Sequence, residues 1–218
     1  MPLTPIPLSL SLAFITTTIL LVLGTPLAWF LSQSRGKIKS LIEAVIMLPL
    51  VLPPTIIGFY LLILLSPSSA IGKFWHSLTG QSLSFSFTGL VIGSVIYSLP
   101  FVVKPIQNSF ESIEKHWLEI AATLRASKRD RFLSVVFPLA KGGFISATLL
   151  GFTHTLGEFG VVLMMGGNIP GKTQTISIAI YDYVETMKYG EAHFLSLVLL
   201  IFSFSALAIL FFYGGKKV

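Results

Sequence analysis

The segment GGNIPGKT, residues 166–173, matches the phosphate-loop pattern G-x-x-x-x-G-K-[ST]. The four required positions are filled by Gly166, Gly171, Lys172 and Thr173. Such a loop binds nucleotide phosphates where a buried strand leads in and a helix leads out, because its glycines let backbone N–H groups approach the phosphates. The apolar run FGVVLMM precedes the segment and ISIAIYDYV follows it. The elements around the segment must therefore decide whether the match is meaningful.

A second group of polar residues lies inside an apolar stretch. Its members follow i, i+3, i+7, i+10 spacing and are Thr148, Gly151, Thr155 and Glu158. This spacing predicts one shared helical face. An ionisable residue at such depth usually faces a bundle interior or water, although Glu158 is also close enough to the end of the stretch to reach the interface. His154 and Glu158 have the i, i+4 spacing of a metal pair, but no third ligand is evident and no metal is expected.

The composition indicates a membrane protein made of helices. Of the 218 residues, 53% are hydrophobic and 11% are charged, and the mean hydropathy is +0.84. Soluble chains are about a quarter charged, and a helix needs ~20 apolar residues to cross a bilayer. We expect one all-α transmembrane domain over residues 1–218, with five spans at about 8–30, 45–65, 85–103, 143–165 and 192–213. The first span lacks a preceding basic residue and a following A-x-A site, so it is not expected to be a cleaved signal peptide.

The distribution of Lys and Arg predicts the orientation. Of 15 such residues, all but three fall before span two, between spans three and four, or at the C-terminus, where Lys216 and Lys217 lie; the exceptions are Lys73, Lys172 and Lys188. The positive-inside rule then places the N-terminus outside and the C-terminus inside. Residues 166–173 would lie outside, away from ATP and without a parallel sheet, so we interpret the phosphate-loop match as false. A turn built on Gly166, Gly167, Pro170 and Gly171 is the better interpretation.

Prolines interrupt the second predicted span. Pro49, Pro53 and Pro54 lie close together in it, and each removes a backbone donor. The freed carbonyls must find partners inside the protein or in a wet cavity. A kinked packing helix and a broken helix lining a path are both consistent with this pattern, and three neighbouring prolines favour the broken helix. The following outer loop, 66–86, has apolar residues that suggest a segment lying at the membrane interface: Ile71, Phe74 and Trp75.

The basic stretch between spans three and four predicts a helix, a break and a second helix. Helical periodicity extends over about 111–124, and the break falls at 125–127. Ser127 followed by Asp130 resembles a capping box with Asp in place of Glu. A loop whose charges only fixed topology would not need two amphipathic helices with small residues at Ala121 and Ala122.

The same stretch resembles the EAA loop of ABC importer permeases, whose pattern is E-A-A-x3-G-x9-I-x-L-P. Glu119, Ala121 and Ala122, followed by Pro138, carry the resemblance, and Glu119 and Pro138 have the family spacing. Further stretches are similar to molybdate permease subunits: LPLVLPP at 48–54, LGEFG at 156–160 and NIPG at 168–171. Sulfate and tungstate permeases look similar. The chain departs from the pattern at Ile120, Arg125, Val135 and Phe137.

Arg125 is the departure with the largest structural consequence, because it occupies the family glycine position. A left-handed turn there costs a residue with a Cβ roughly 1–2 kcal/mol. Either the turn differs in this chain or Arg125 bears some strain.

The resemblance implies a subunit of an importer for molybdate or a similar oxyanion in the cytoplasmic (inner) membrane of a prokaryote. It implies a homodimer, two cytoplasmic ATPase subunits that hold ATP and Mg, and an extracytoplasmic oxyanion-binding protein. This chain would bind no cofactor and no nucleic acid, contact membrane lipid and catalyse no reaction. The ATPase-coupling loop would comprise Glu119, Ala121, Ala122, Arg125, Ser127, Lys128, Arg129, Arg131 and Pro138. The translocation path would include Pro49, Pro53, Pro54, Thr148, Gly151, Thr155 and Glu158.

Two expectations follow for the chemistry of the path and of the loop. No Lys or Arg lies in a predicted span, so an oxyanion would meet hydroxyls, backbone N–H groups and helix N-termini. The basic residues at 128, 129 and 131 would meet acidic ATPase residues, or serve as topology signals or lipid contacts. An ATPase-independent channel or carrier would explain the spans but not the loop, and no convergent catalytic set supports an enzyme.

Overall fold

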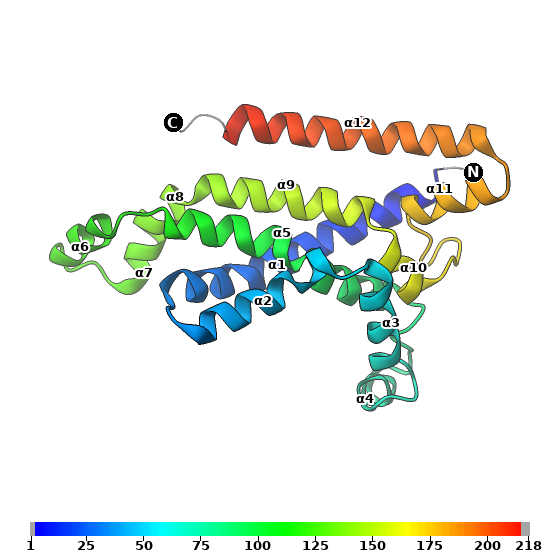
Figure 1. Ribbon diagram of the computed structural model, residues 1–218, viewed down its shortest axis with the longest axis horizontal. Helices are drawn as coiled ribbons and strands as arrows, with labels where there is room; N and C mark the ends of the chain where they lie inside the picture. Colours follow the sequence, from blue (N-terminus) through cyan, green and yellow to red (C-terminus); the bar gives the residue numbers. More distant parts are fainter. Residues whose placement is uncertain (1–2, 215–218) are drawn as a thin grey trace.

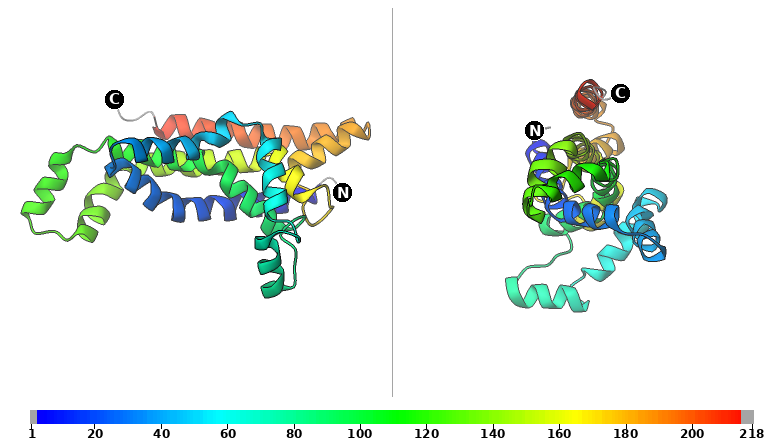
Figure 2. Two further views of the ribbon diagram at one scale, coloured as in Figure 1. Left: turned by 60° about the horizontal axis from the view of Figure 1, so that its bottom comes forward. Right: turned by 90° about the vertical axis from the view of Figure 1, so that its left-hand side faces the viewer.

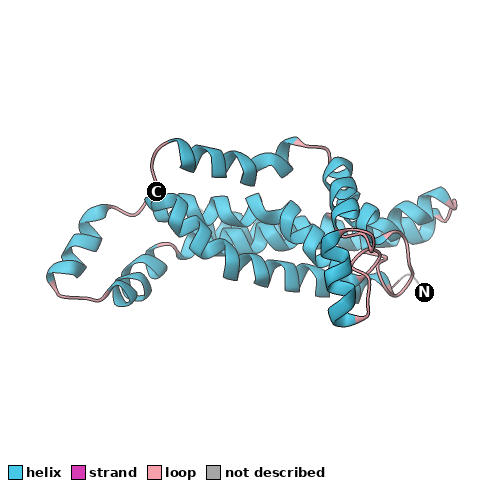
Figure 3. Ribbon diagram, turned by 90° about the horizontal axis from the view of Figure 1, so that it is seen from below, coloured by secondary structure: helices cyan, strands magenta, loops and turns pink. Residues whose placement is uncertain are grey.

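The computed structural model describes residues 3–214, and within that range it is helical without any strand (Figures 1 and 3). Three long helices pack side by side in its centre: α1 (Pro5–Gln33), α5 (Phe87–Glu111) and α9 (Lys141–Gly157). Helix α12 (Tyr189–Gly214) lies along the outside of α9. The prediction of an all-α membrane protein is confirmed. Lys216 and Lys217, which entered the orientation prediction, lie outside the described residues.

The central helices pack through small and branched side chains. Leu20 and Ala28 of α1, Val102 and Ile106 of α5 and Ala147 of α9 belong to one fully buried cluster. Small residues let transmembrane helices approach closely, which replaces the hydrophobic driving force that lipid does not supply. The bundle therefore depends on close contact between backbones.

The elements that could span a membrane are of two kinds, single long helices and bent helix pairs. In the described part of the chain, α1, α5 and α12 are long and apolar enough to cross a membrane, and two bent helix pairs raise the number to as many as five. The predicted spans 8–30 and 85–103 fall largely in α1 and α5. The predicted span 143–165 is divided, because α9 ends at Gly157 and α10 (Gly160–Gly166) follows a break.

The proline-rich span is a broken helix, as the sequence predicted. Helix α2 (Lys37–Val51) and helix α3 (Pro54–Leu64) meet at an angle of 110°. Leu52 and Pro53 are extended, with ψ of 139° and 135°, because a residue that precedes proline is pushed out of the helical region. Pro49 stays inside α2 and is buried.

The loop predicted at 66–86 contains a short helix, α4 (Ala70–Thr79), which lies away from the bundle (Figure 2). The Ser69 hydroxyl accepts a hydrogen bond from the Gly72 backbone and caps its start. Ile71 and Phe74 are exposed, whereas Trp75 packs against a core cluster. The helix thus presents apolar side chains to its surroundings.

The two ends of the bundle differ in shape. Helix α6 (Lys115–Thr123) and helix α7 (Lys128–Arg131) project beyond the bundle at one end, and the first described residues lie at the other (Figures 1 and 3). The last described residues lie toward the end that carries α6 and α7. The described part of the chain thus begins and ends at opposite ends of the bundle.

Candidate functional site

The projecting loop begins with a break that the sequence did not indicate. The predicted helix over 111–124 is wrong at its start, because Glu111 ends α5 and α6 begins after Glu114. Glu114 is extended, with ψ of 134°, and turns the chain between the two helices. Amphipathic periodicity continues across such a turn and therefore does not reveal it.

The turn after α6 keeps the left-handed conformation despite Arg125, whose φ is +59°. The Ala126 N–H donates to the Ala121 carbonyl at 3.1 Å, and the Arg125 N–H donates to the Ala122 carbonyl at 3.0 Å. This pair of bonds is the Schellman motif that satisfies the last carbonyls of a helix. Of the two alternatives for the family glycine position, the structure has the second: the turn is preserved and Arg125 adopts the unfavourable conformation.

The second helix of the loop begins with the predicted capping box. The Ser127 hydroxyl accepts from the Asp130 N–H at 3.1 Å, and the Asp130 carboxylate accepts from the Ser127 N–H at 3.2 Å. After α7 the chain forms a π-helix, η1 (Phe132–Val136), and then α8 (Phe137–Leu139). Pro138 lacks an N–H and crowds the carbonyl one turn back, which disfavours regular α-helical bonding there.

Helix α6 has an inner and an outer face. Ala121 is only 8% exposed, whereas Ala122 and Glu119 are exposed. Three apolar side chains at i, i+3, i+7 spacing form an outward stripe, with 48%, 49% and 77% exposure: Trp117, Ile120 and Leu124. A patch of this kind on a projecting element marks an interaction surface.

The two chain breaks meet inside the molecule. A Cβ added to Gly160 would lie 2.6 Å from the Pro54 Cβ, so the start of α3 packs directly against the start of α10. A pocket of roughly 590 Å³ lies at this junction, lined by side chains that include Tyr97, His154 and Glu158. The breaks therefore leave an open pocket between α3 and α10, part of whose lining, such as Thr55, is exposed.

Glu158 is the last residue of the predicted face and the C-cap of α9, which ends at Gly157. Its φ of −65° is helical, so its side chain keeps the register of the helix, and its ψ of 135° turns the chain only after it. The side chain is 5% exposed, buried like Gly151 and Thr155, and Ser94 of α5 is the polar side chain beside it. The break therefore follows the predicted face rather than interrupting it.

The other members of that register have separate surroundings. Thr155 hydrogen-bonds Ser98 of α5 at 3.0 Å, and Gly151 packs against α5. Thr148 is exposed and donates to the Phe144 carbonyl at 2.8 Å. The structure thus directs only part of the predicted stripe into the protomer interior.

His154 is held by neighbours on α5 rather than by Glu158. Its Nδ1 lies 2.9 Å from the Ser98 hydroxyl, and its ring stacks on Phe101 with centroids 3.8 Å apart. Within residues 3–214, no group of three His, Asp or Glu side chains gathers to hold a metal ion.

The phosphate-loop segment is a compact turn rather than a strand-to-helix loop. Gly167 and Gly171 have φ of +64° and +74°. The buried Thr173 hydroxyl donates to the Gly166 carbonyl at 2.7 Å and accepts from the Ile169 N–H at 3.3 Å. No strand precedes it in the described chain, so the segment lacks the strand-to-helix context of a phosphate loop.

Sequence reasoning missed a polar network that joins α2 to α5. Lys39 and Glu111 form an ion pair at 2.8 Å, and Lys104 lies 3.5 Å from Glu43. Gln107 donates to Glu111 at 2.9 Å. The i, i+4 spacings of Lys39 with Glu43 and of Gln107 with Glu111 are local signals for this network.

Comparison with known proteins places these features in a family. Residues 20–214 match the family described as binding-protein-dependent transport system inner membrane component. The chain is 54% identical to the molybdenum transport system permease protein ModB of Azotobacter vinelandii over 206 residues, 94% of this chain and 91% of the relative. It is 39% identical to ModB of Haemophilus influenzae, over 85% of this chain and 81% of the relative. A probable sulfate transport system permease, cysT of Zygnema circumcarinatum, is 33% identical over 86% of this chain and 65% of that relative.

Solved structures with the same fold are more distant in sequence. An inward-facing MetNI methionine ABC transporter has a chain with a TM-score of 0.71 and 16% identity, covering 97% of this chain and 92% of that chain. A bacterial ABC transporter that imports alginate gives 0.74 and 15%, covering 96% and 76%. The matched residues, the projecting helix pair and the bundle agree on one assignment. This chain belongs to the family of inner membrane components of binding-protein-dependent transport systems.

Proposed function

We propose that this chain is the permease subunit of an ATP-driven importer of molybdate. The observation that carries the proposal is the projecting loop, which combines the EAA-type residues with the exposed stripe Trp117, Ile120 and Leu124 on a family-typical bundle. The choice of molybdate as substrate is supported by the relatives named for molybdenum transport, which are 54% and 39% identical to this chain.

The proposed assembly is a homodimer with two ATPase subunits and an extracytoplasmic oxyanion-binding protein. ATP and Mg belong to the ATPase, and this chain catalyses no reaction. The projecting loop faces the cytoplasm and the start of α1 faces outward, as the positive-inside rule requires. The outer face of α6 then docks into an ATPase groove, while the buried Ala121 keeps α6 close to the rest of the loop.

The proposed path passes the junction of the two chain breaks. There the first turn of α3 offers the Thr55 N–H, since Pro53 and Pro54 have no N–H and the Ile56 N–H donates to the Pro53 carbonyl at 3.0 Å. Backbone N–H groups at helix N-termini bind anions. Thr155 and Ser98 supply hydroxyls nearby on α9 and α5. A path without fixed cations holds an oxyanion weakly, and rigid-body rocking of the subunits releases it.

Replacing Ala122 with glutamate tests the coupling function. Ala122 is exposed on α6, so Ala122→Glu is expected to leave insertion and folding intact. Ala122 lies on the opposite side of α6 from the stripe, and the proposed groove encloses both exposed sides of the helix. A charge there is expected to abolish molybdate uptake and ATPase copurification, since an unpaired buried charge is strongly unfavourable. Ala70→Glu is the matched control, because Ala70 is exposed in the first turn of α4.

Uptake and ATPase stimulation by loaded binding protein are measured in reconstituted vesicles. Normal uptake by Ala122→Glu would show that α6 does not couple the ATPase to transport.

The sulfate permease relative makes sulfate the second candidate substrate. Competition of labelled molybdate uptake by sulfate and by tungstate separates these oxyanions, and uptake without any ATPase would indicate a channel or carrier instead.

A further inference from the structure

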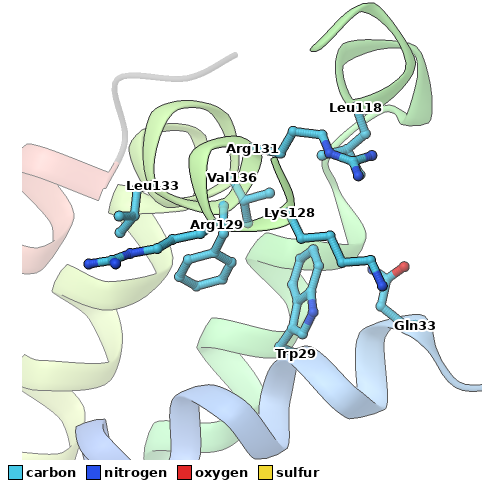
Figure 4. A pocket seen from close by; sticks show the side chains of 9 residues that line it. Trp29, Gln33, Leu118, Lys128, Arg129, Arg131, Leu133 and Val136 are labelled. Carbon is cyan, nitrogen blue, oxygen red and sulfur yellow. The ribbon is translucent and has the colours of Figure 1, made fainter. Parts of the chain in front are cut away.

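A pocket of roughly 640 Å³ lies where the projecting loop joins the bundle (Figure 4). The end of α1 forms one wall with Trp29 and Gln33. Leu118 of α6 and the residues of η1 form the apolar walls. Three cationic side chains from the start of α7 complete the lining: Lys128, Arg129 and Arg131. The pocket therefore combines concentrated positive charge with a large apolar surface.

The three cations have no carboxylate partner in the described chain. No ion pair joins any of them to an acidic residue in residues 3–214. Asp130, the acidic residue of α7, bonds to Ser127 in the capping box. The Nε of Arg131 is buried and lacks a hydrogen-bond partner. In Figure 4 the Arg129 side chain extends away from Lys128 and Arg131, so these two residues supply the charge on one side of the pocket. A guanidinium suits a phosphate because it can donate two parallel hydrogen bonds.

The pocket lies at the end of a predicted span. Trp29 belongs to the last part of the span 8–30, and its ring packs edge-on against Phe110 and Phe132, with centroids 5.2 and 5.5 Å away. In Figure 4 the Lys128 side chain extends past Trp29 toward Gln33, and the Arg131 side chain extends toward Leu118. A second pocket of roughly 320 Å³ shares Trp29, Gln33, Leu118 and Val136 and adds both Arg35 and Glu111, of which Glu111 is paired with Lys39. Charge and apolar surface are thus adjacent at the end of α1, where tryptophan suits the level of lipid headgroups.

The pocket is separate from the face that we assign to the ATPase. Leu118 and Ala121 are one turn apart on the inner side of α6, and Ala121 is buried. The exposed stripe Trp117, Ile120 and Leu124 points outward instead. An ATPase docked on the stripe would leave the inner pocket for another ligand, and mixed apolar and basic walls favour a lipid over an acidic protein side chain.

We propose that this pocket binds the phosphate group of an anionic phospholipid. Lys128 and Arg131 hold the phosphate, while Trp29 and Leu133 contact the start of an acyl chain. Basic pockets between helices on the cytoplasmic side of membrane proteins bind such headgroups. This inference rests on the proposed function, since the cytoplasmic orientation of the loop comes from it. A lipid held there joins the end of α1 to the loop and fixes the angle at which the loop meets an ATPase.

Binding is tested on the purified full chain in detergent. Native mass spectrometry counts bound phosphatidylglycerol, and thermal unfolding measures the stabilisation that bound ligand gives. We expect phosphatidylglycerol to bind and raise the Tm, and phosphatidylcholine to do neither. The double variant Lys128→Gln/Arg131→Gln is expected to bind phosphatidylglycerol at least about tenfold more weakly, since each cation near a headgroup contributes ~1 kcal/mol.

Two matched variants isolate the cause. Lys37→Gln/Lys141→Gln removes two exposed cations outside the pocket and should bind normally. Lys128→Arg/Arg131→Lys keeps the charge and should also retain binding, which excludes a folding defect as the explanation.

Equal binding of phosphatidylcholine, or retained binding by the glutamine double variant, would overturn the proposal. So would equal stabilisation by inorganic phosphate at the same phosphate concentration, since a free anion would then suffice. The measurement needs no ATPase, so its failure would leave the uptake and Ala122→Glu results untouched.

Discussion

Arg125 shows how one backbone conformation shapes the coupling element. Its φ of +59° lets the chain reverse between α6 and α7 while the Schellman bonds at Arg125 and Ala126 satisfy the end of α6. Glycine adopts this conformation without steric cost, whereas arginine does not. Because the turn survives with arginine, the two capped helices around it outweigh the local strain.

Arg125→Gly is expected to stabilise the loop by roughly 1–2 kcal/mol and to retain uptake, because it removes the steric cost of the left-handed conformation. The matched control is Arg129→Gly, within the α-helical turn of α7, where glycine costs about 1 kcal/mol relative to alanine. Thermal unfolding of each purified variant and uptake in vesicles provide the comparison. Loss of uptake by Arg125→Gly with normal ATPase association would mean that the guanidinium itself has a functional role.

At the scale of elements, the contact between α9 and α5 limits the size of the side chains that α9 can have on its inner face. A Cβ added to Gly151 would lie 2.5 Å from the Val102 Cγ2 of α5. Gly151 is therefore a position of close helix approach inside one protomer. A bulky side chain there disturbs packing in addition to any effect on transport.

Gly151→Ala is expected to destabilise the purified chain by ~1–3 kcal/mol, the usual cost of overpacking. Gly142→Ala is the matched control, since nothing lies within 4 Å of a Cβ added at that exposed helical glycine. Val102→Ala is expected to restore part of the lost stability in the double variant by removing the opposing methyl groups. The readout is the Tm in detergent. An unchanged Tm for Gly151→Ala would show that α9 and α5 separate readily at this point.

At the scale of the whole molecule, charge and shape are both asymmetric along the bundle axis. The basic residues gather near the projecting α6 and α7, while Lys73 and Lys172 lie in the segments near the opposite end. The described chain also begins and ends at opposite ends of the bundle (Figure 1). A chain that crosses a membrane an odd number of times begins and ends on opposite sides of it.

Single cysteines test the proposed orientation directly, because the chain contains no Cys of its own. Gln81→Cys, in the loop after α4, is expected to react with a membrane-impermeant maleimide on intact cells. Lys37→Cys, at the start of α2, is expected to react only after the membrane is permeabilised. Both side chains belong to exposed residues. The opposite labelling pattern would invert the proposed orientation and move the projecting loop out of the cytoplasm.

The sequence by itself determined the features that depend on neighbours along the chain. Apolar runs predicted the spans, and the prolines at 53 and 54 predicted the break between α2 and α3. The Ser127–Asp130 spacing predicted the capping box, and the glycine position of the family pattern identified the turn at Arg125. Each is a local property, because backbone sterics, missing donors and side-chain caps act within a few residues.

Only the tertiary structure decided which distant residues meet. It ended α9 at Gly157 and buried Glu158, and it set Gly160 against Pro54 to form the pocket between α3 and α10. It also placed Trp29 beside the basic residues of α7, about a hundred positions later in the chain. Hydrophobic periodicity reports which face of a helix is apolar but not which helix covers it. The close packing of the complete bundle decides which helix packs against which, because a small residue on one helix leaves room for a particular side chain of its neighbour.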